Sequence, residues 1–213
     1  MSHYSLQDAQ HYAAHHQKSL RTRLTTFRER RLLASALRQC GQPASILDIP
    51  CGAGRFWQVL FGSGIGQLIA ADNSDGMLSV ARESWAQESE RLQLLNTSVF
   101  AIDLPDRAVD VVCCLRFFHH VALPADRHIA LRELHRVAGS HVIVSLWVDG
   151  NLQSRRRMRR DALRTVAPGF GPRRCLSRAD FERECADVGF TVKRHWDVAP
   201  GWSMWRFYLL GKS

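Results

Sequence analysis

The sequence has 213 residues, of which 46% are hydrophobic and 23% are charged. This length and balance predict one globular domain with a modest extension, and they exclude a disordered chain. The sequence lacks the run of about 18 apolar residues that a membrane-spanning helix needs. Its start lacks the pattern of a signal peptide, so we expect a cytoplasmic protein. The net charge of +9 allows nucleic acid, an anionic lipid surface or a phosphorylated molecule as a partner.

The six cysteines do not form a CxxC pair or a Cys/His spacing typical of zinc. Cys113 and Cys114 lie within the apolar run 109–115, where a thiol usually packs as a small hydrophobic group. We therefore expect reduced structural cysteines and no bound metal.

The N-terminal part of the chain reads as helix. Between residues 20 and 42, apolar residues recur at helical spacing before Gly41 ends the stretch. These residues are Leu24, Phe27, Leu32, Leu33, Ala36 and Leu37. Residues 6–18 are expected to form a short helix of their own. The pattern predicts a helical extension, or lid, over residues 1–42 and a main domain over residues 43–213.

From residue 45 onward, predicted strands alternate with predicted helices. Strands are expected over residues 45–49, 67–71, 92–99, 109–115 and 141–147, and two more over 191–196 and 204–210. Helices are expected over residues 55–61, from a cap at Ser74, from Pro124 to Gly139, and over 177–189. In the helix after Pro124, the residues expected to face inward are Ile129, Leu131, Leu134 and Val137.

This alternation predicts an α/β fold. Strands joined through helices form a mostly parallel sheet with helices on both faces. The last two strands follow each other without a helix, which requires one antiparallel strand near the C-terminus. The expected architecture is a Rossmann-like, doubly wound, seven-stranded sheet with an N-terminal helical extension.

The first strand runs into a glycine turn, Cys51-Gly52-Ala53-Gly54, and a helix follows. Glycines allow close approach of a ligand to the backbone, and a helix start offers free N–H groups. Dinucleotide sites have a third glycine, where this chain has Trp57. Asp48 before the turn suits a ligand with an amino or sulfonium group better than a phosphate. The residues therefore favour a cationic ligand over a pyrophosphate.

The segment from Leu47 to Gly54, LDIPCGAG, resembles the LDxGCGxG motif of class I S-adenosylmethionine-dependent methyltransferases, in particular the type 11-like domain. Pro50 departs from the motif, because the family usually has glycine there. Further matches are AADNSDGML at 70–78, LPD at 104–106 with VDVV at 109–112, and LRFFHHV at 115–121. Together they extend the resemblance over about residues 43–213.

The resemblance implies S-adenosylmethionine as the cofactor, with S-adenosylhomocysteine as the product. It implies that Asp72 accepts hydrogen bonds from the ribose hydroxyls. Phe100 stands where the family often has an acidic residue beside adenine, so we expect ring packing there and backbone recognition near Ala101. The cofactor-binding residues expected in full are Asp48, Pro50, Gly52, Gly54, Arg55, Asp72, Asn73, Met77, Phe100, Ala101 and Leu115.

His119 and His120 follow the fourth strand, where the resemblance places the reacting groups. An imidazole can act as a general base, which makes both candidates for catalysis. The alternative is a helix start or a packed polar pair, because alignment of an activated methyl group can supply much of the rate without a base.

The candidate substrate residues are Tyr12, His16, Trp147, Arg155 and Arg159. The two arginines belong to a basic run over residues 154–174, which suits either an anionic acceptor or a solvated helix face. Tyr12 and His16 belong to a segment that often covers the acceptor pocket in this family. Alternatively, Tyr12 and His16 are exposed residues of a helix, and Trp147 is a core side chain.

The sequence thus predicts a methyltransferase that modifies O or N of a small molecule or a cell-envelope component, and the basic run allows that acceptor to be anionic. The alternatives are an RNA methyltransferase, a non-catalytic S-adenosylmethionine-binding protein and a nicotinamide-dependent oxidoreductase, which Trp57 disfavours. An RNA acceptor is suggested by the charge, although no RNA-binding appendage or NPPY-like motif is present. The acceptor and the oligomeric state are not determined by the sequence.

Overall fold

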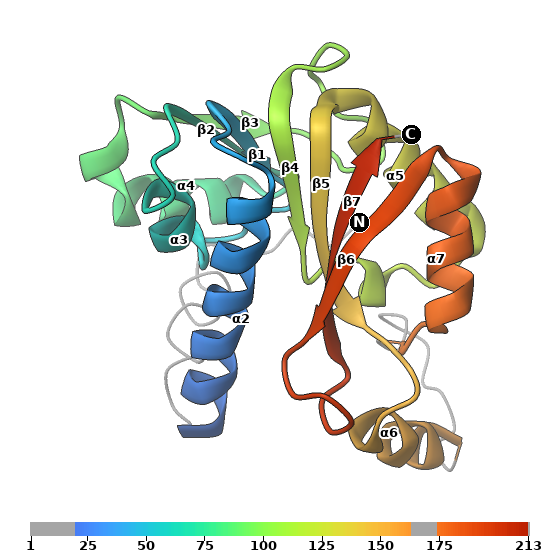
Figure 1. Cartoon of the computed structure of the whole chain (residues 1–213). Coiled ribbons are helices and arrows are strands. Elements are labelled where there is room, and N and C mark those ends of the chain that lie inside the picture. Colours follow the sequence, from blue (N-terminus) through green and yellow to red (C-terminus); the bar gives the residue numbers. More distant parts are fainter. Residues whose placement is uncertain (1–19, 163–173, 213) are drawn as a thin grey trace.

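The computed structural model describes residues 20–162 and 174–212 (Figure 1). The strands are β1 (Ser45–Asp48), β2 (Gln67–Asp72), β3 (Leu92–Asn96), β4 (Val109–Leu115), β5 (Ala138–Trp147), β6 (Phe190–Asp197) and β7 (Trp205–Lys212). The α-helices are α2 (Leu20–Gln39), α3 (Trp57–Phe61), α4 (Asp75–Ser84), α5 (Pro124–Val137), α6 (Leu152–Ala162) and α7 (Arg178–Asp187). Two single-turn 3-10 helices cover Ala86–Glu88 and Phe118–His120.

The seven strands form one sheet in the order β3-β2-β1-β4-β5-β7-β6. Strands β1 to β5 pair in parallel, and β7 runs antiparallel to both β5 and β6. The predicted Rossmann-like sheet with one antiparallel strand near the C-terminus is confirmed. Because parallel strands share a direction, the carboxyl ends of β1, β2, β4 and β5 lie along one edge of the sheet, where ligands bind in such folds.

Each face of the sheet is covered by its own apolar core. One core packs α5 and α7 on the sheet, and the other packs α2, α3 and α4 on the opposite face. The buried strand β4 supplies both: Cys113 and Leu115 point to one core, and Val112 and Cys114 to the other. This alternation of side chains along a strand explains why β4 reads as a continuous apolar run.

Several local expectations were wrong. Helix α5 ends at Val137 and β5 begins at once, so Gly139 lies in the strand, where a Cβ would be 3.0 Å from the carbonyl oxygen of Val109. Ile129 was expected to face inward and is 39% exposed. Leu24 and Phe27 of α2 are 62% and 56% exposed, since the helix runs past the end of the sheet (Figure 1).

None of the helices in the described part of the chain has the length and apolarity to cross a membrane. All six cysteines lie in that part and are free thiols. Among the described residues, no His, Cys, Asp and Glu side chains gather in a group that would hold a metal ion. The helix expected over residues 6–18 lies outside the described residues, and the domain division at residue 42 stays a prediction.

Candidate cofactor and acceptor site

The glycine turn after β1 is joined to the end of β2 by Asp72. One carboxylate oxygen of Asp72 accepts a hydrogen bond from the N–H of Gly52 at 2.9 Å, and the other accepts from the N–H of Ser74 at 3.0 Å. Burial raises the pKa of Asp72, and its hydrogen bonds from the backbone oppose that rise. The carboxylate therefore fixes two turns against each other at the carboxyl edge of the sheet.

The two glycines of the turn differ in the space beside their Cα atoms. Both have a positive φ, +55° at Gly52 and +77° at Gly54, which disfavours other residues. A Cβ on Gly52 would meet no atom within 4 Å, so space is open beside Asp72. A Cβ on Gly54 would lie 2.6 Å from the Trp57 ring and 2.8 Å from Trp85. Gly52 thus borders an open cradle, whereas Gly54 allows two tryptophans to pack.

Asp48 lies under this turn and is only 3% exposed. The indole N–H of Trp57 donates a hydrogen bond to its carboxylate at 2.9 Å. Burial raises the pKa of Asp48 to about 7, and the nearby Asp72 adds to the rise. Trp57, which in the sequence argued only against a dinucleotide, thus holds the acid of the motif in place.

The other predicted cofactor residues surround the same turn. The Ile49–Pro50 peptide bond is cis. Met77 is buried and packs with Val80 on Ala53 of the turn. Asn73 is exposed and Leu115 is buried at the end of β4. The structure therefore brings all of these residues to one edge of the sheet.

Phe100 is 39% exposed and lies edge-on to Phe117, with 5.7 Å between the ring centroids. The exposed ring of Phe100, held by the partly buried Phe117, offers a face on which a base can stack. The N–H of Ala101 donates to the carbonyl oxygen of Ser98 at 3.1 Å, and its carbonyl oxygen accepts from Thr97 at 2.9 Å. Ring packing at Phe100 thus has a physical basis, whereas the backbone groups of Ala101 already have partners within the loop.

Glu29 of α2 is a feature of the site that the sequence analysis missed. Its side chain is fully buried and accepts hydrogen bonds from Arg55 at 3.1 Å and from Arg116 at 2.9 Å. Arg116 follows β4 in a left-handed conformation, with φ of +61°. The middle of α2 is therefore fixed across the ends of β1 and β4. In the sequence, Glu29 could have been noticed as the single acidic residue of a helix that is rich in arginine.

The candidate catalytic histidines differ in exposure. His119 is 3% exposed, stacks on Trp147 at 4.5 Å and meets Trp205 edge-on at 5.1 Å. His120 is exposed, and its ring lies 4.2 Å from that of His119. The cluster lies at the ends of β4, β5 and β7. His120 is therefore open to solvent, whereas His119 is packed among aromatic rings.

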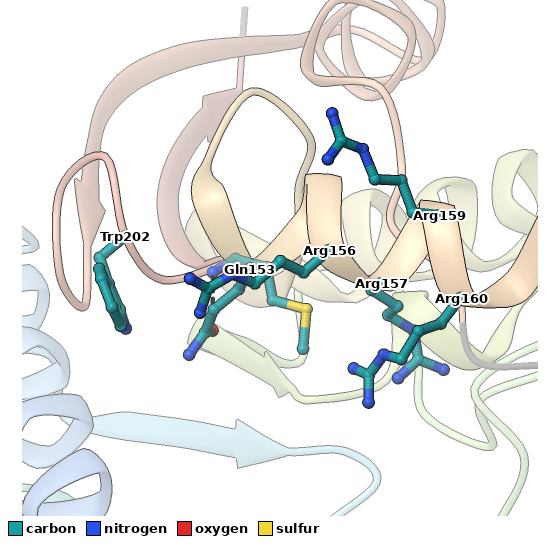
Figure 2. Close-up of a pocket in the computed structure, with 7 residues that line it drawn as sticks. Gln153, Arg156, Arg157, Arg159, Arg160 and Trp202 are labelled. Carbon is teal, nitrogen blue, oxygen red and sulfur yellow. Dashed lines mark hydrogen bonds between the residues drawn. The ribbon is translucent and has the colours of Figure 1, made fainter.

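The basic run begins as helix α6, which lies beyond the ends of β5 and β7 in Figure 1. A hollow of about 550 Å³ lies beside α6, lined by arginines of that helix and by Gln153 and Trp202. Figure 2 draws these side chains. Arg159 lines this hollow, whereas Arg155 is exposed and does not. Tyr12 and His16 lie outside the described residues, so their proposed roles stay predictions.

The thiols at this end of the sheet are unsuited to be nucleophiles. Burial raises the pKa of Cys51, Cys113 and Cys114 well above the ordinary value. A thiol with a raised pKa is held in its neutral form, which is the less reactive one. These cysteines therefore serve as packing groups, as the sequence predicts.

The sheet order, the glycine turn and the acids that end β1 and β2 define the class I methyltransferase fold. Residues 47–146 match the family model described as a methyltransferase domain. This stretch of the chain is therefore similar to a methyltransferase domain, and the fold is that of S-adenosylmethionine-dependent methyltransferases of known structure.

Solved structures agree with this fold. A magnesium protoporphyrin IX methyltransferase from Synechocystis PCC 6803 with bound SAH has a TM-score of 0.72 at 14% identity, over 92% of this chain and 89% of that one. An S-adenosylmethionine-dependent methyltransferase from Clostridium acetobutylicum has a TM-score of 0.73 at 11% identity, over 96% and 98%. One from Aquifex aeolicus has a TM-score of 0.60 at 21% identity, over 83% and 87%. No curated protein matches the sequence.

Proposed function

We propose that the protein transfers a methyl group from S-adenosylmethionine to O or N of a small-molecule or cell-envelope acceptor bound at the carboxyl edge of the sheet. The observation that carries this proposal is the hydrogen bond from Gly52 to Asp72 beside open space. A carboxylate in that position suits ribose hydroxyls, because it has lone pairs left after accepting from the backbone. The exposed ring of Phe100 suits the adenine.

The remaining residues of the turn fit the other end of the cofactor. Asp48 supplies negative charge beneath the turn when it is ionised, which suits an amino group or a sulfonium. When bound, S-adenosylmethionine supplies a sulfonium methyl group, whose carbon–sulfur bond breaks as a bond to the acceptor atom forms, while the acceptor gives up a proton. Pro50, Arg55, Asn73, Met77, Ala101 and Leu115 complete the proposed cofactor site.

On the acceptor side, we assign contact with the ligand to His120 and a positioning role to His119. The ring of His119 is held against Trp147 and Trp205, so it fixes the turn that carries His120. An exposed imidazole can take up the acceptor's proton as a general base. Replacing His120 with Ala is expected to lower turnover and leave SAH affinity unchanged.

The first test is ligand-dependent thermal stability. S-adenosylhomocysteine is expected to raise the melting temperature of the full chain, and NAD is expected to leave it unchanged, because a ligand stabilises only a fold that binds it. The opposite result would contradict the assigned cofactor. Transfer of radiolabelled methyl groups into cell extracts, separated into RNA, lipid and small-molecule pools, would then distinguish an enzyme from a non-catalytic binding protein.

The second test is Asp72→Ala. Loss of a strong hydrogen-bond acceptor is expected to weaken SAH binding by about 1–3 kcal/mol, measured by titration calorimetry. The exposed Asp103 gives a matched control, because its side chain accepts no hydrogen bond among the described residues. Asp103→Ala should bind SAH as the natural chain does. Equal affinity of both variants would show that Asp72 does not contact the cofactor.

A further inference from the structure

The hollow beside α6 is built by two segments that lie about fifty residues apart in the sequence. The backbone N–H groups of Leu152 and Gln153 donate to the carbonyl oxygens of Gly201 and Trp202, each at 3.0 Å. The side chain of Gln153 accepts a hydrogen bond from the N–H of Met204 at 3.3 Å. The start of α6 is thus fixed on the loop between β6 and β7, and the arginines that follow line a defined cavity.

The charge in this hollow is unbalanced. Arg156, Arg159 and Arg160 line it, and none of the three pairs with a carboxylate in the described part of the chain. Arg156 and Arg160 are one helical turn apart, a spacing at which like charges destabilise a helix. A cavity with several cations and no acid lowers its free energy by binding an anion.

The hollow also has an aromatic wall that leads toward the acceptor side. Trp202 is 49% exposed, and the guanidinium of Arg156 lies 5.6 Å from the centre of its ring. The guanidinium of Arg157, also in the lining, lies 4.6 Å from the ring of Trp147, which stacks on His119. The cavity and the proposed acceptor site therefore share a wall.

We propose that this cavity, the arginine–Trp202 pocket, binds a phosphate-bearing part of the methyl acceptor. Guanidinium groups bind phosphate oxygens through paired N–H donors, and a tryptophan face beside them accommodates the adjoining apolar or planar part. The phosphate belongs either to a soluble phosphorylated metabolite or to a lipid head group. Calling this ligand the acceptor rests on the proposed function; the anion site itself does not.

The probe is inorganic pyrophosphate, titrated calorimetrically into the full chain in a buffer free of phosphate. The natural protein is expected to bind it saturably. The double variant Arg156→Gln/Arg160→Gln should bind it about tenfold or more weakly. The matched control is Arg28→Gln/Arg155→Gln, which removes the same charge from exposed helix positions outside the pocket. The control should bind pyrophosphate as the natural chain does.

Equal loss of binding in the two double variants would overturn the proposal, because it would show attraction to general surface charge. Absence of binding to the natural chain would overturn it as well. Titration with S-adenosylhomocysteine is done in parallel on all three proteins and should give one affinity. Failure of that titration would count against the proposed function, and the pyrophosphate result would still decide the pocket.

Two further arms assign the source of the phosphate. Phosphatidylcholine vesicles doped with phosphatidic acid should compete with pyrophosphate if the phosphate is a lipid head group. Failure to compete, with pyrophosphate binding intact, supports a soluble metabolite. A single-stranded RNA that binds more tightly than pyrophosphate, with a steep salt dependence that is lost only in the pocket variant, would overturn the proposal in favour of an RNA acceptor.

Discussion

Two groups of arginines in this protein have opposite surroundings. Arg127 lies between α5 and α7 and pairs with Glu184, and both side chains are nearly buried, at 7% and 6% exposure. Arg206 on β7 pairs in the same way with Asp197 of β6 through two hydrogen bonds. Arg156 and Arg160 on α6 are exposed and border a hollow.

The difference separates structural charge from charge available to a ligand. A buried arginine must have its carboxylate partner, because an uncompensated charge in the interior is costly. An exposed arginine without a partner keeps its water, which an anion can displace. The first group therefore contributes to the fold, and the second is available for recognition.

The largest effect is expected for Glu184→Gln. The change leaves the guanidinium of Arg127 buried with neutral acceptors alone, which are the carbonyl oxygens of Val121 and Ala122 and the amide oxygen of the new glutamine. We expect a loss of about 3–5 kcal/mol in the free energy of unfolding, measured by urea denaturation.

The control for this change is Glu88→Gln, which breaks the exposed pair of Glu88 with Arg91 and should cost about 1 kcal/mol or less. In addition, replacing both Arg127 and Glu184 with Met should restore part of the loss, because no charge is then left buried alone. Similar losses in the free energy of unfolding for the buried and the exposed pair would show that burial does not make the partner of Arg127 necessary.

Carboxylates also differ in whether an arginine pairs with them, and their pKa values differ as a result. The hydrogen bond from Arg136 lowers the pKa of Glu133. Asp48 has an indole N–H in place of an arginine, and burial raises its pKa to about 7. Because the folded protein then holds a proton that the unfolded chain releases near pH 4, stability falls as the pH rises from about 4 to about 7.

Asp48→Asn removes this dependence and still allows a hydrogen bond from Trp57. Relative to the natural chain, we expect no gain near pH 4 and a gain of up to about 4 kcal/mol at pH 8, by urea denaturation. Asp103→Asn, at an exposed position, should follow the natural chain at both pH values. A gain that does not change with pH would show that Asp48 is ionised in the folded protein.

The fold could be predicted largely from local patterns. The strand β4 has the predicted bounds because its apolar run is continuous and both of its faces are buried. The end of α5 could not be predicted, since Gly139 marks close approach to Val109 in the sheet and not a helix cap. The exposure of Leu24 and Phe27 depends on where α2 leaves the sheet, which the periodicity of a helix does not determine.

The candidate site also has a part that is local in the sequence and a part that is not. The turn and its acids lie within a few residues of β1 and β2, so a short motif contains them. Glu29 and Arg116 are 87 residues apart, and the pocket joins α6 to the loop at Trp202. The proximity of α6 to that loop follows from the order of the strands, which brings β5 and β7 side by side. Sequence patterns thus predicted the cofactor side and left the arginine pocket as a choice between a ligand site and a solvated helix.

The smallest effect on stability is expected for Arg156→Gln/Arg160→Gln, the variant that should lose pyrophosphate binding. If these arginines are kept for a ligand, the fold does not depend on them. Glutamine has a similar helix propensity, and the change removes repulsion between like charges one turn apart. We expect the free energy of unfolding to stay the same or to rise by up to about 0.5 kcal/mol in a phosphate-free buffer.

Added salt supplies the control for this last change. Any gain should shrink in about 0.5 M sodium chloride, because salt screens the repulsion between exposed charges. Arg28→Gln/Arg155→Gln should also leave stability within about 0.5 kcal/mol, as expected for surface positions. A loss of more than about 1 kcal/mol in the pocket variant alone would mean that Arg156 and Arg160 hold α6 in place, as Arg127 holds α5 and α7. The two groups of arginines would then differ only in exposure.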